Sequence, residues 1–407
     1  MADLIIAGNI VSPEGVKYSQ VLVDTDKGVI KKIGNNLGVS DFIAGDDSLI
    51  FAGFIDLHVH SREDASGKQN HKEDFKTVSN AGINGGVTYI ADMPNNPVPP
   101  VDDKSFKEKE ALTGKSDVGV LLYAGIGQKT RPLKKHVPYK VFMGQSVGDL
   151  FFESNNELEK AMEKYSGKSV SFHCEDESIL TANKNEATHE KQRPREAEIT
   201  AIKFALELIK KYRLQGKICH CSTMEGLELI KQAKGDGVNV TCEVTPHHMY
   251  FDEKDVKNNL LKMNPPLRTG KDRIALIEGL KKGDIDYLAT DHAPHLITEK
   301  EQGMAGVPHL DTYSKIASWL IKSCGLSPED IARVCSYNPG RFIGEFTAEK
   351  LGLIEEGYSA NLTIINLEKE EKVTKEMIKS KCGWSPFEGE VLPGIVEALF
   401  IDGRRFY

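Results

Sequence analysis

The chain has 407 residues, of which 40% are hydrophobic and 28% charged, and its formal net charge is −8. This is the composition of an ordinary globular protein, and the mixing of both charge signs argues against nucleic acid as a partner. No run approaches the ~18 apolar residues of a membrane span, and the start, MADLIIAGNIVS, lacks the basic region of a signal peptide. The seven scattered cysteines argue against a disulfide framework, so a cytoplasmic location is predicted.

The first fifty residues are expected to form short strands at Leu4–Ile10, Gln20–Asp24 and Val29–Gly34, where β-branched residues are punctuated by Gly and Asn. From about Phe51, apolar strand-like runs alternate with longer amphipathic stretches, a pattern typical of βα units and a parallel sheet. Eight runs are predicted strands: Phe51–His58, Val87–Met93, Val118–Ile126, Tyr139–Met143, Val170–His173, Lys217–His220, Asn239–Val244 and Asp286–Thr290.

Helical patterns lie between most of these runs, and the clearest is Glu196–Lys211. Eight βα units without a Gly-rich phosphate loop favour a closed, TIM-like (β/α)8 barrel over an open doubly wound sheet, which uses the same local pattern. The last sixty residues return to short strands at Asn361–Asn366, Val391–Pro393 and Ile395–Ile401. We therefore expect residues 1–50 and 346–407 to join in one small β-sandwich domain beside a barrel of residues 51–345.

The strongest chemical signal is the pair His58 and His60 at the end of the first barrel strand. Side chains alternate along a strand, so both imidazoles point to the same side, which can be the barrel mouth where such enzymes place their sites. Two converging imidazoles suit a divalent metal such as zinc. An isolated HxH is more often two exposed histidines, so the interpretation depends on the residues that follow.

Four later strands each deliver a further ligand type to the same rim: Lys140, His173, His220 and Asp291. One such residue is unremarkable, but five strands supplying ligands to one rim is hard to explain as packing. A charged lysine among apolar residues is costly to bury, whereas a neutral amine reacts with CO2 to give a carbamate that can bridge two metals. The alternative is a lysine that pairs with an acid and reaches solvent. With four histidines and an aspartate around Lys140, the carbamate is favoured.

The ordered motifs GFIDLHVHSRE, MPNNP, YKVFMG, HCED, HCST, CEVTPHH, MNPPLR and ATDHAPH resemble the amidohydrolase superfamily, and within it the dihydroorotases. The similarity continues through WSPFEG near the C-terminus and spans nearly the whole chain. The resemblance implies a barrel hydrolase that interconverts N-carbamoyl-L-aspartate and dihydroorotate in pyrimidine biosynthesis. It further implies two zinc ions with a bridging hydroxide.

The resemblance also assigns roles to single residues. His58 and His60 would bind one metal, His173 and His220 the other, and a carbamylated Lys140 would bridge both. Asp291 would bind the first metal and transfer the proton. The implied substrate contacts are Arg62, Asn95 and His295 for the carboxylate, Asn264 for the ring, and backbone groups around Ala305 and Gly306 for the ring amides.

Two features depart from the pattern or extend it. His309 and Asp311 stand where relatives commonly have Gly and Glu, which leaves the ring contacts of this loop open. Cys219 and Glu243 lie beside the rim and could hold an additional metal. Because Cys219 neighbours a ligand on a strand, it should point the opposite way, which argues against that third site.

Two rival functions are considered. Hydantoinases, dihydropyrimidinases and allantoinases share the metal ligands but commonly lack Arg62 and the Asn95 context. A non-catalytic scaffold would usually have lost metal ligands, and this chain retains all six. The expected partner is a small-molecule substrate, with no nucleic acid and no membrane. A homodimer and an association with other pyrimidine-pathway enzymes are left open.

Overall fold

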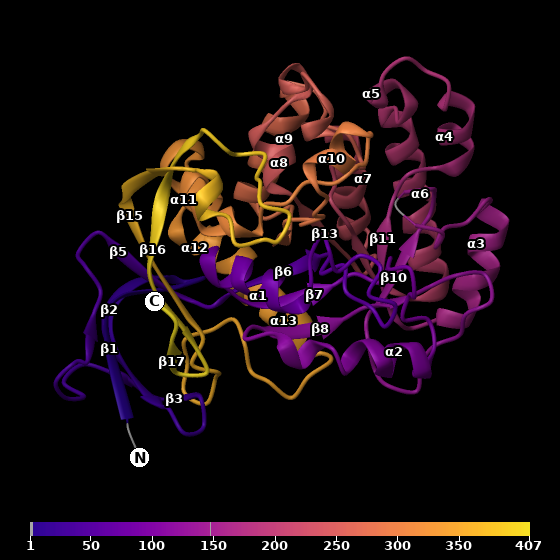
Figure 1. Ribbon diagram of the computed structural model, residues 1–407. Helices are drawn as coiled ribbons and strands as arrows, with labels where there is room; N and C mark the ends of the chain where they lie inside the picture. Colours follow the sequence, from indigo (N-terminus) through magenta and orange to yellow (C-terminus); the bar gives the residue numbers. More distant parts are fainter. Residues whose placement is uncertain (1–2, 147) are drawn as a thin grey trace.

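The two ends of the chain meet in one curled sheet. The computed structural model describes residues 3–146 and 148–407, and Figure 1 shows this sheet beside the barrel, with β1 next to β2 and β15 next to β16. The strand order is β17-β16-β15-β5-β1-β2-β3, and β4 pairs with β1. The bounds are β1 (Asp3–Ser12), β2 (Gly15–Asp24), β3 (Val29–Gly34), β4 (Phe42–Ile43), β5 (Ser48–Ala52), β15 (Leu362–Lys372), β16 (Val391–Ile401) and β17 (Arg404–Arg405).

The junction between the termini is the antiparallel pair β5–β15, in which Ile50 lies opposite Ile364. The sheet curls until Val29 at the start of β3 bridges Ser359. Its two halves therefore enclose one core, which includes Val21 from β2 and Phe400 from β16. The predicted small β domain is confirmed, as a single hydrogen-bonded sheet folded over its own core rather than two separate sheets.

The eight predicted parallel strands are confirmed. They are β6 (Phe54–Val59), β7 (Val87–Asp92), β8 (Gly119–Leu122) with β9 (Ala124–Gly125), β10 (Tyr139–Phe142), β11 (Ser169–His173), β12 (Gln215–Ile218), β13 (Val240–Val244) and β14 (Tyr287–Leu288).

Hydrogen bonds close these strands into a barrel. Tyr123 joins β8 to β9 within one predicted run, and its backbone N–H donates to the carbonyl of Asp92 at the end of β7. Past the end of β14, the carbonyl of His292 accepts from the N–H of His60 at 2.9 Å, and Val59 bridges His292. The barrel strands are mostly buried because helices cover their outer faces and side chains fill the interior.

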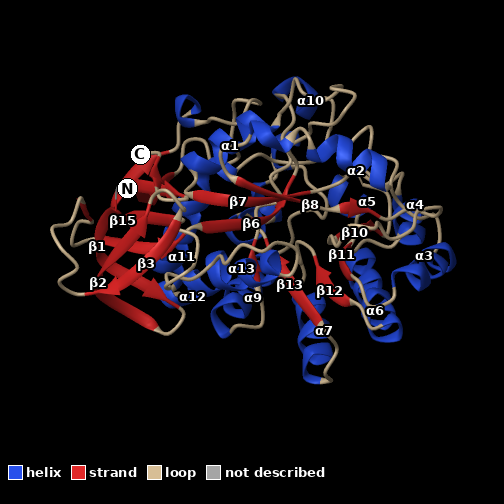
Figure 2. Cartoon of the chain, turned by 90° about the horizontal axis from the view of Figure 1, so that it is seen from below, coloured by secondary structure: helices blue, strands red, loops and turns tan. Residues whose placement is uncertain are grey.

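Helices surround the barrel strands, as Figure 2 shows. The predicted helix Glu196–Lys211 is α6 (Arg195–Tyr212), which buries Ile202 and Leu208 and ends at a left-handed Arg213. The remaining helices are α1 (Phe75–Asn84), α2 (Asp103–Glu110), α3 (Asn155–Met162), α4 (Glu177–Asn183), α5 (His189–Gln192), α7 (Met224–Gly235), α8 (Pro246–Tyr250), α9 (Gly270–Lys282), α10 (Ile297–Glu301), α11 (Tyr313–Cys324), α12 (Pro328–Ala332) and α13 (Asn338–Gly344).

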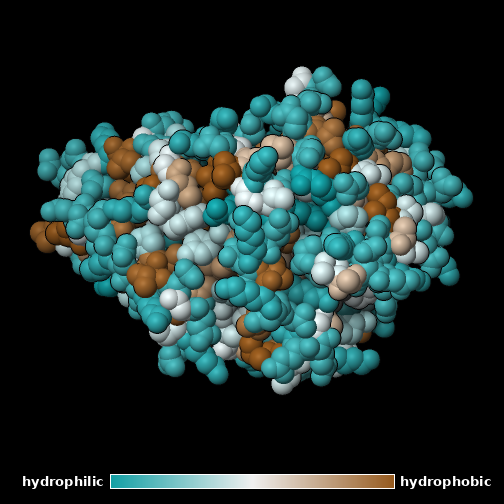
Figure 3. Space-filling model, turned by 90° about the horizontal axis from the view of Figure 1, so that it is seen from above, coloured by the Kyte–Doolittle hydropathy of each residue, from teal (hydrophilic) through white to brown (hydrophobic). Residues whose placement is uncertain are grey.

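The face of the molecule in Figure 3 is mostly hydrophilic, and apolar side chains appear on it in small scattered groups. Within residues 3–146 and 148–407, no helix combines the length and the apolar character that crossing a bilayer requires.

Candidate metal and substrate site

The predicted site residues gather at the carboxyl ends of the barrel strands. One cavity there is lined by His58, His60, Arg62, Asn95, His173, His220, Asn264, Asp291, Ala305 and Gly306, together with Phe142, Ser146 and Ala293. A neighbouring cavity of about 410 Å³ shares Ser146, Asn264 and Ala305 with it and therefore adjoins it on the outside. Two predicted residues, Lys140 and His295, lie just behind this lining and are fully buried.

Three of the predicted residues have left-handed backbone conformations: Arg62 (φ 63°), His220 (φ 35°) and Asp291 (φ 50°). Such conformations are costly for residues other than glycine, by roughly 1–3 kcal/mol each, and they cluster at functional sites. Each of the three follows a barrel strand end, where the left-handed residue redirects the chain at the barrel rim.

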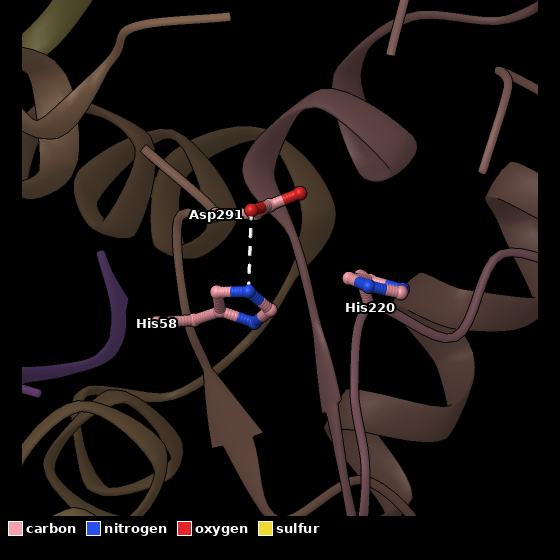
Figure 4. A group of neighbouring side chains, drawn as sticks. All are labelled: His58, His220 and Asp291. Atoms are coloured by element: carbon pink, nitrogen blue, oxygen red, sulfur yellow. Dashed lines mark ion pairs between the residues drawn. The ribbon is translucent and has the colours of Figure 1, made fainter. Parts of the chain in front are cut away.

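The first group of ligand atoms consists of acceptors that face one another. Glu243 accepts a hydrogen bond from Nδ1 of His58, and Asn95 Oδ1 accepts from Nδ1 of His60 at 2.6 Å. These partners leave both Nε2 atoms as bare acceptors. The Nε2 atoms lie 3.2 Å and 3.0 Å from Oδ1 of Asp291. Figure 4 shows the contact of His58 with Asp291, with His220 beside them. Nε2 of His58, Nε2 of His60 and Oδ1 of Asp291 are acceptors that point toward one another, and a cation bound between them would contact all three.

The second pair of imidazoles is His173 and His220. Nε2 of His173 donates to Glu175 at 2.9 Å, so its Nδ1 is the acceptor, and that atom lies 2.9 Å from Nε2 of His220. Arg193 binds Glu175 with both Nε and Nη2, at 2.9 Å and 2.5 Å. Burial alone would raise the pKa of Glu175, but the paired Arg193 and the hydrogen bond from His173 outweigh it and hold the pKa of that carboxyl well below its usual range.

The site holds its histidines neutral, which is the form that binds metals. Burial lowers the pKa of His58 and of His60 far below the ordinary value. Lys140 lies close enough to lower the pKa of all four histidines. Burial also raises the pKa of Asp291 to about 7, which suits a group that must both take and give a proton near neutral pH.

The donor set fits a divalent cation, because ligand atoms of His58, His220 and Asp291 all lie within 4.8 Å of one another. One group of acceptors comes from His58, His60 and Asp291, the other from His173 and His220, and Lys140 influences both. Nζ of Lys140 has no carboxylate partner among the described residues; it donates to the sulfur of Cys219 at 2.8 Å. Lys140 is 0% exposed and pairs with no described carboxylate. It therefore does not fit the alternative interpretation, in which it pairs with an acid and reaches solvent.

The prediction that the side chain of Cys219 points away from the candidate ligands was wrong. Strand β12 ends at Ile218, and the left-handed His220 breaks the alternation, so Cys219 points inward and touches Lys140. Cys219, Glu243 and His58 consequently lie together. Both oxygens of Glu243 are engaged, one by His58 and the N–H of His220, the other by Lys217 at 2.5 Å. Glu243 therefore orients two candidate ligands, a role that the sequence analysis missed.

The three residues expected to hold a carboxylate differ in their contacts. Nη2 of Arg62 lies 3.2 Å from Nε2 of His295, and its Nε donates to the carbonyl of Pro294. Arg62 is only 2% exposed and forms no ion pair with any described carboxylate, and burial lowers its pKa to about 10. Asn95 lines the same cavity and accepts a hydrogen bond from Nδ1 of His60.

The loop at Gly303–Gly306 borders the other side of the cavity. Gly306 has φ 132°, and a Cβ added there would lie 2.7 Å from the carbonyl of Ala293, so only glycine fits. The N–H of Gly306 donates to the carbonyl of Lys262, and Nδ2 of Asn264 donates to Ser146. The hydrogen bond of Gly306 is therefore internal to the protein, which leaves Ala305 as the better candidate for a backbone contact to a ligand.

The two departures from the family pattern lie away from this cavity. Nε2 of His309 is 2.9 Å from Nδ1 of His247, and the carboxylate of Asp311 accepts from the N–H groups of Lys379 and Ser380. Both residues are structural in this chain, since neither lines the cavity. Three further polar partners at the site were not found from the sequence: Lys72 contacts His295, Glu175 contacts His173, and Arg193 contacts Glu175.

Comparisons with known proteins agree with this geometry. A model of the amidohydrolase family matches residues 151–405. A dihydroorotase from Thermococcus kodakarensis is 35% identical and covers 99% of this chain and 94% of its own length. A dihydroorotase from Lactobacillus gasseri is 32% identical, with 100% and 99% covered. An L-hydantoinase (dihydropyrimidinase) structure from Arthrobacter aurescens has a TM-score of 0.90 at 25% identity, covering 100% of this chain and 96% of that chain.

The chain belongs to the amidohydrolase family and shares the fold of the L-hydantoinase structure. Within that family it belongs to the dihydroorotases, because relatives of that group match it at 31–35% identity over nearly its full length.

Proposed function

We propose that the protein catalyses the reversible cyclisation of N-carbamoyl-L-aspartate to (S)-dihydroorotate with loss of water, as part of pyrimidine biosynthesis. The observation that supports this substrate is Arg62, a buried guanidinium on the wall of the candidate metal cavity that pairs with no carboxylate of the described residues. Its rigid donor fork matches a carboxylate bidentately. Both the open-chain and the cyclic substrate carry a carboxylate that takes no part in the bond-making or bond-breaking step.

Two zinc ions are proposed for the ligand set. His58, His60 and Asp291 would hold one, His173 and His220 the other, and a carbamate on Lys140 would bridge them. Imidazole and carboxylate donors suit zinc among the common divalent metals. When bound, such a pair supplies a water-derived nucleophile at neutral pH and polarises the amide carbonyl.

The chain's own residues then divide the remaining work. Arg62 and His295 bind the substrate carboxylate, while Asn264 and the backbone at Ala305 position the ring. In the hydrolytic direction, Asp291 accepts the proton as a C–O bond forms at the amide carbon. It returns the proton to the ring nitrogen as the C–N bond breaks. In the synthetic direction the same proton moves back, and water leaves.

The main rival is a cyclic amidase for neutral rings, because the L-hydantoinase structure shares the fold. Arg62 separates the two readings: a neutral ring offers no anion to offset the cost of burying an unpaired guanidinium. A non-catalytic scaffold is disfavoured, since the acceptor groups and their orienting partners are retained together.

The proposed location is the cytoplasm. All seven cysteines are free, and six of them are buried. Proteins that keep every thiol reduced are typical of reducing compartments.

The deciding experiment is an assay of carbamoyl aspartate and dihydroorotate beside neutral hydantoins, with metal counted on the same sample. Turnover of the two carboxylate-bearing substrates well above that of hydantoins is expected. Preferential turnover of a neutral ring would transfer the protein to the rival group, and metal-free protein with full activity would remove the mechanism.

A further inference from the structure

A second buried cation lies behind the proposed carboxylate site. Lys72, in the loop before α1, is 5% exposed. Its Nζ lies 2.9 Å from Oε1 of Glu299 and 3.2 Å from Nδ1 of His295. Lys72 does not line the cavity itself, so any effect on a ligand passes through His295.

His295 stands between two groups that can only donate. Lys72 faces its Nδ1, and Nη2 of Arg62 faces its Nε2 at 3.2 Å. Burial and these two cations hold the pKa of His295 far below its ordinary value, so the ring is neutral. A neutral imidazole has a single acceptor nitrogen, and therefore only one of the two cations can donate to it.

The surroundings decide which nitrogen accepts. Glu299 could in principle take a proton from Nδ1, but its Oε2 is 3.7 Å away and accepts from the N–H of Leu296 at 2.9 Å. Its other oxygen holds Lys72. Nδ1 of His295 is thus left to accept from Lys72, and the ring proton belongs on Nε2, which faces Arg62 on the cavity wall.

We propose that Lys72 is a positioning residue that fixes His295 in its Nε2–H tautomer, so that His295 and Arg62 present two N–H donors to one substrate carboxylate. The inference rests on the proposed function. It adds to it Lys72, the residue that makes Nε2 of His295 a hydrogen-bond donor. Two donors 3.2 Å apart repel each other until a shared anionic acceptor lies between them. A substrate carboxylate is such an acceptor.

The kinetic test compares Lys72→Met with Lys72→Arg and a matched control, Lys76→Met. Lys76 lies in the same segment but is exposed and pairs with Asp117 at 2.5 Å, away from the cavity. In Lys72→Met, KM for carbamoyl aspartate should rise by about tenfold, the loss of one charge-assisted hydrogen bond, while kcat changes much less. Lys72→Arg should recover part of the loss, and Lys76→Met should match the wild type.

The tautomer is read independently by ¹⁵N NMR of histidine-labelled protein, with the His295 signals assigned from a His295→Gln sample. The wild type should show Nε2–H, and Lys72→Met should lose that preference. Either an unchanged KM or an unchanged His295 tautomer in Lys72→Met overturns the proposal. An Nδ1–H tautomer in the wild type also overturns it, whether or not the variant folds. Absence of dihydroorotate turnover in the wild type would instead refute the proposed function, and the NMR result would still decide the tautomer.

Discussion

Replacing Arg62 with methionine should separate activity from stability. The guanidinium is 2% exposed, it faces no described carboxylate within ion-pair distance, and its Nε donates to the carbonyl of Pro294 at 3.3 Å. Methionine has a similar length and fills the space without a charge. If Arg62 serves substrate binding, burying its charge lowers the free energy of unfolding of the wild type. The methionine variant does not carry that penalty.

The magnitude follows from the pKa of the guanidinium, which burial lowers from 12.5 to about 10. Neutral pH lies below both values, so the group is charged in the folded and the unfolded chain and the full cost is present. At ~1.36 kcal/mol per pKa unit, that cost is about 3 kcal/mol. Loss of the hydrogen bond to Pro294 lowers the stability of the variant by about 1 kcal/mol and offsets part of this gain. The free energy of unfolding of Arg62→Met should therefore rise by about 2 kcal/mol, and the melting temperature by a few degrees.

Activity should move in the opposite direction. A hydrogen bond to a charged group contributes roughly 1.5–3 kcal/mol, so kcat/KM for carbamoyl aspartate should fall by at least about tenfold. Turnover of a neutral cyclic amide should fall much less. The matched control is Arg195→Met: Arg195 is paired with Asp272 and Glu225 outside the cavity, so its removal should lower stability and spare activity. A large loss of stability in Arg62→Met, or equal losses on charged and neutral substrates, would refute the reasoning.

The remaining predictions concern the metal centre. Asp291→Asn should keep the fold, as judged by circular dichroism, and lose at least ~10²–10⁴-fold in kcat; activity within a few-fold of wild type would assign the proton transfer elsewhere. Lys140→Ala should lose metal and activity, with partial rescue by short carboxylic acids; full metal occupancy without rescue would exclude a carbamate bridge. Glu243→Gln should weaken metal affinity by roughly 10–100-fold in a chelator titration, because Glu243 orients His58 and the N–H of His220, whereas unchanged affinity would make its contacts incidental. Chelation should abolish activity and zinc should restore it, with elemental analysis expected to count two metals per chain.

Local pattern was sufficient for most of the fold. Buried parallel strands read as continuous apolar runs, and each of the eight predicted runs overlaps a barrel strand, from β6 (Phe54–Val59) to β14 (Tyr287–Leu288). The helix expected at Glu196–Lys211 differs from α6 by one residue at each end. The joining of the two termini was also predicted, because both ends of the chain carry strands with no partner inside the barrel. Short irregular helices such as α10 (Ile297–Glu301) were not, since they arise where loops pack against one another.

The candidate ligands could be placed from the sequence because position at a strand end determines which rim of a barrel a side chain reaches. His58, Lys140 and Asp291 needed only this rule, and the structure brings them to one place. The rule failed at Cys219, which lies past the last residue of β12, where alternation no longer governs direction.

The orientation of those ligands was decided only by the tertiary structure. Glu243 sets the tautomer of His58 across 185 residues of chain, and Lys72 reaches His295 across 223. Neither pair has a local signature, because a hydrogen bond depends on distance and angle in space and not on separation in sequence. The sequence by itself therefore determined which chemical groups reach the rim of the barrel. Closure of the barrel decided which nitrogen of each imidazole carries a proton, because it brings distant acids and lysines within hydrogen-bonding distance of the rings.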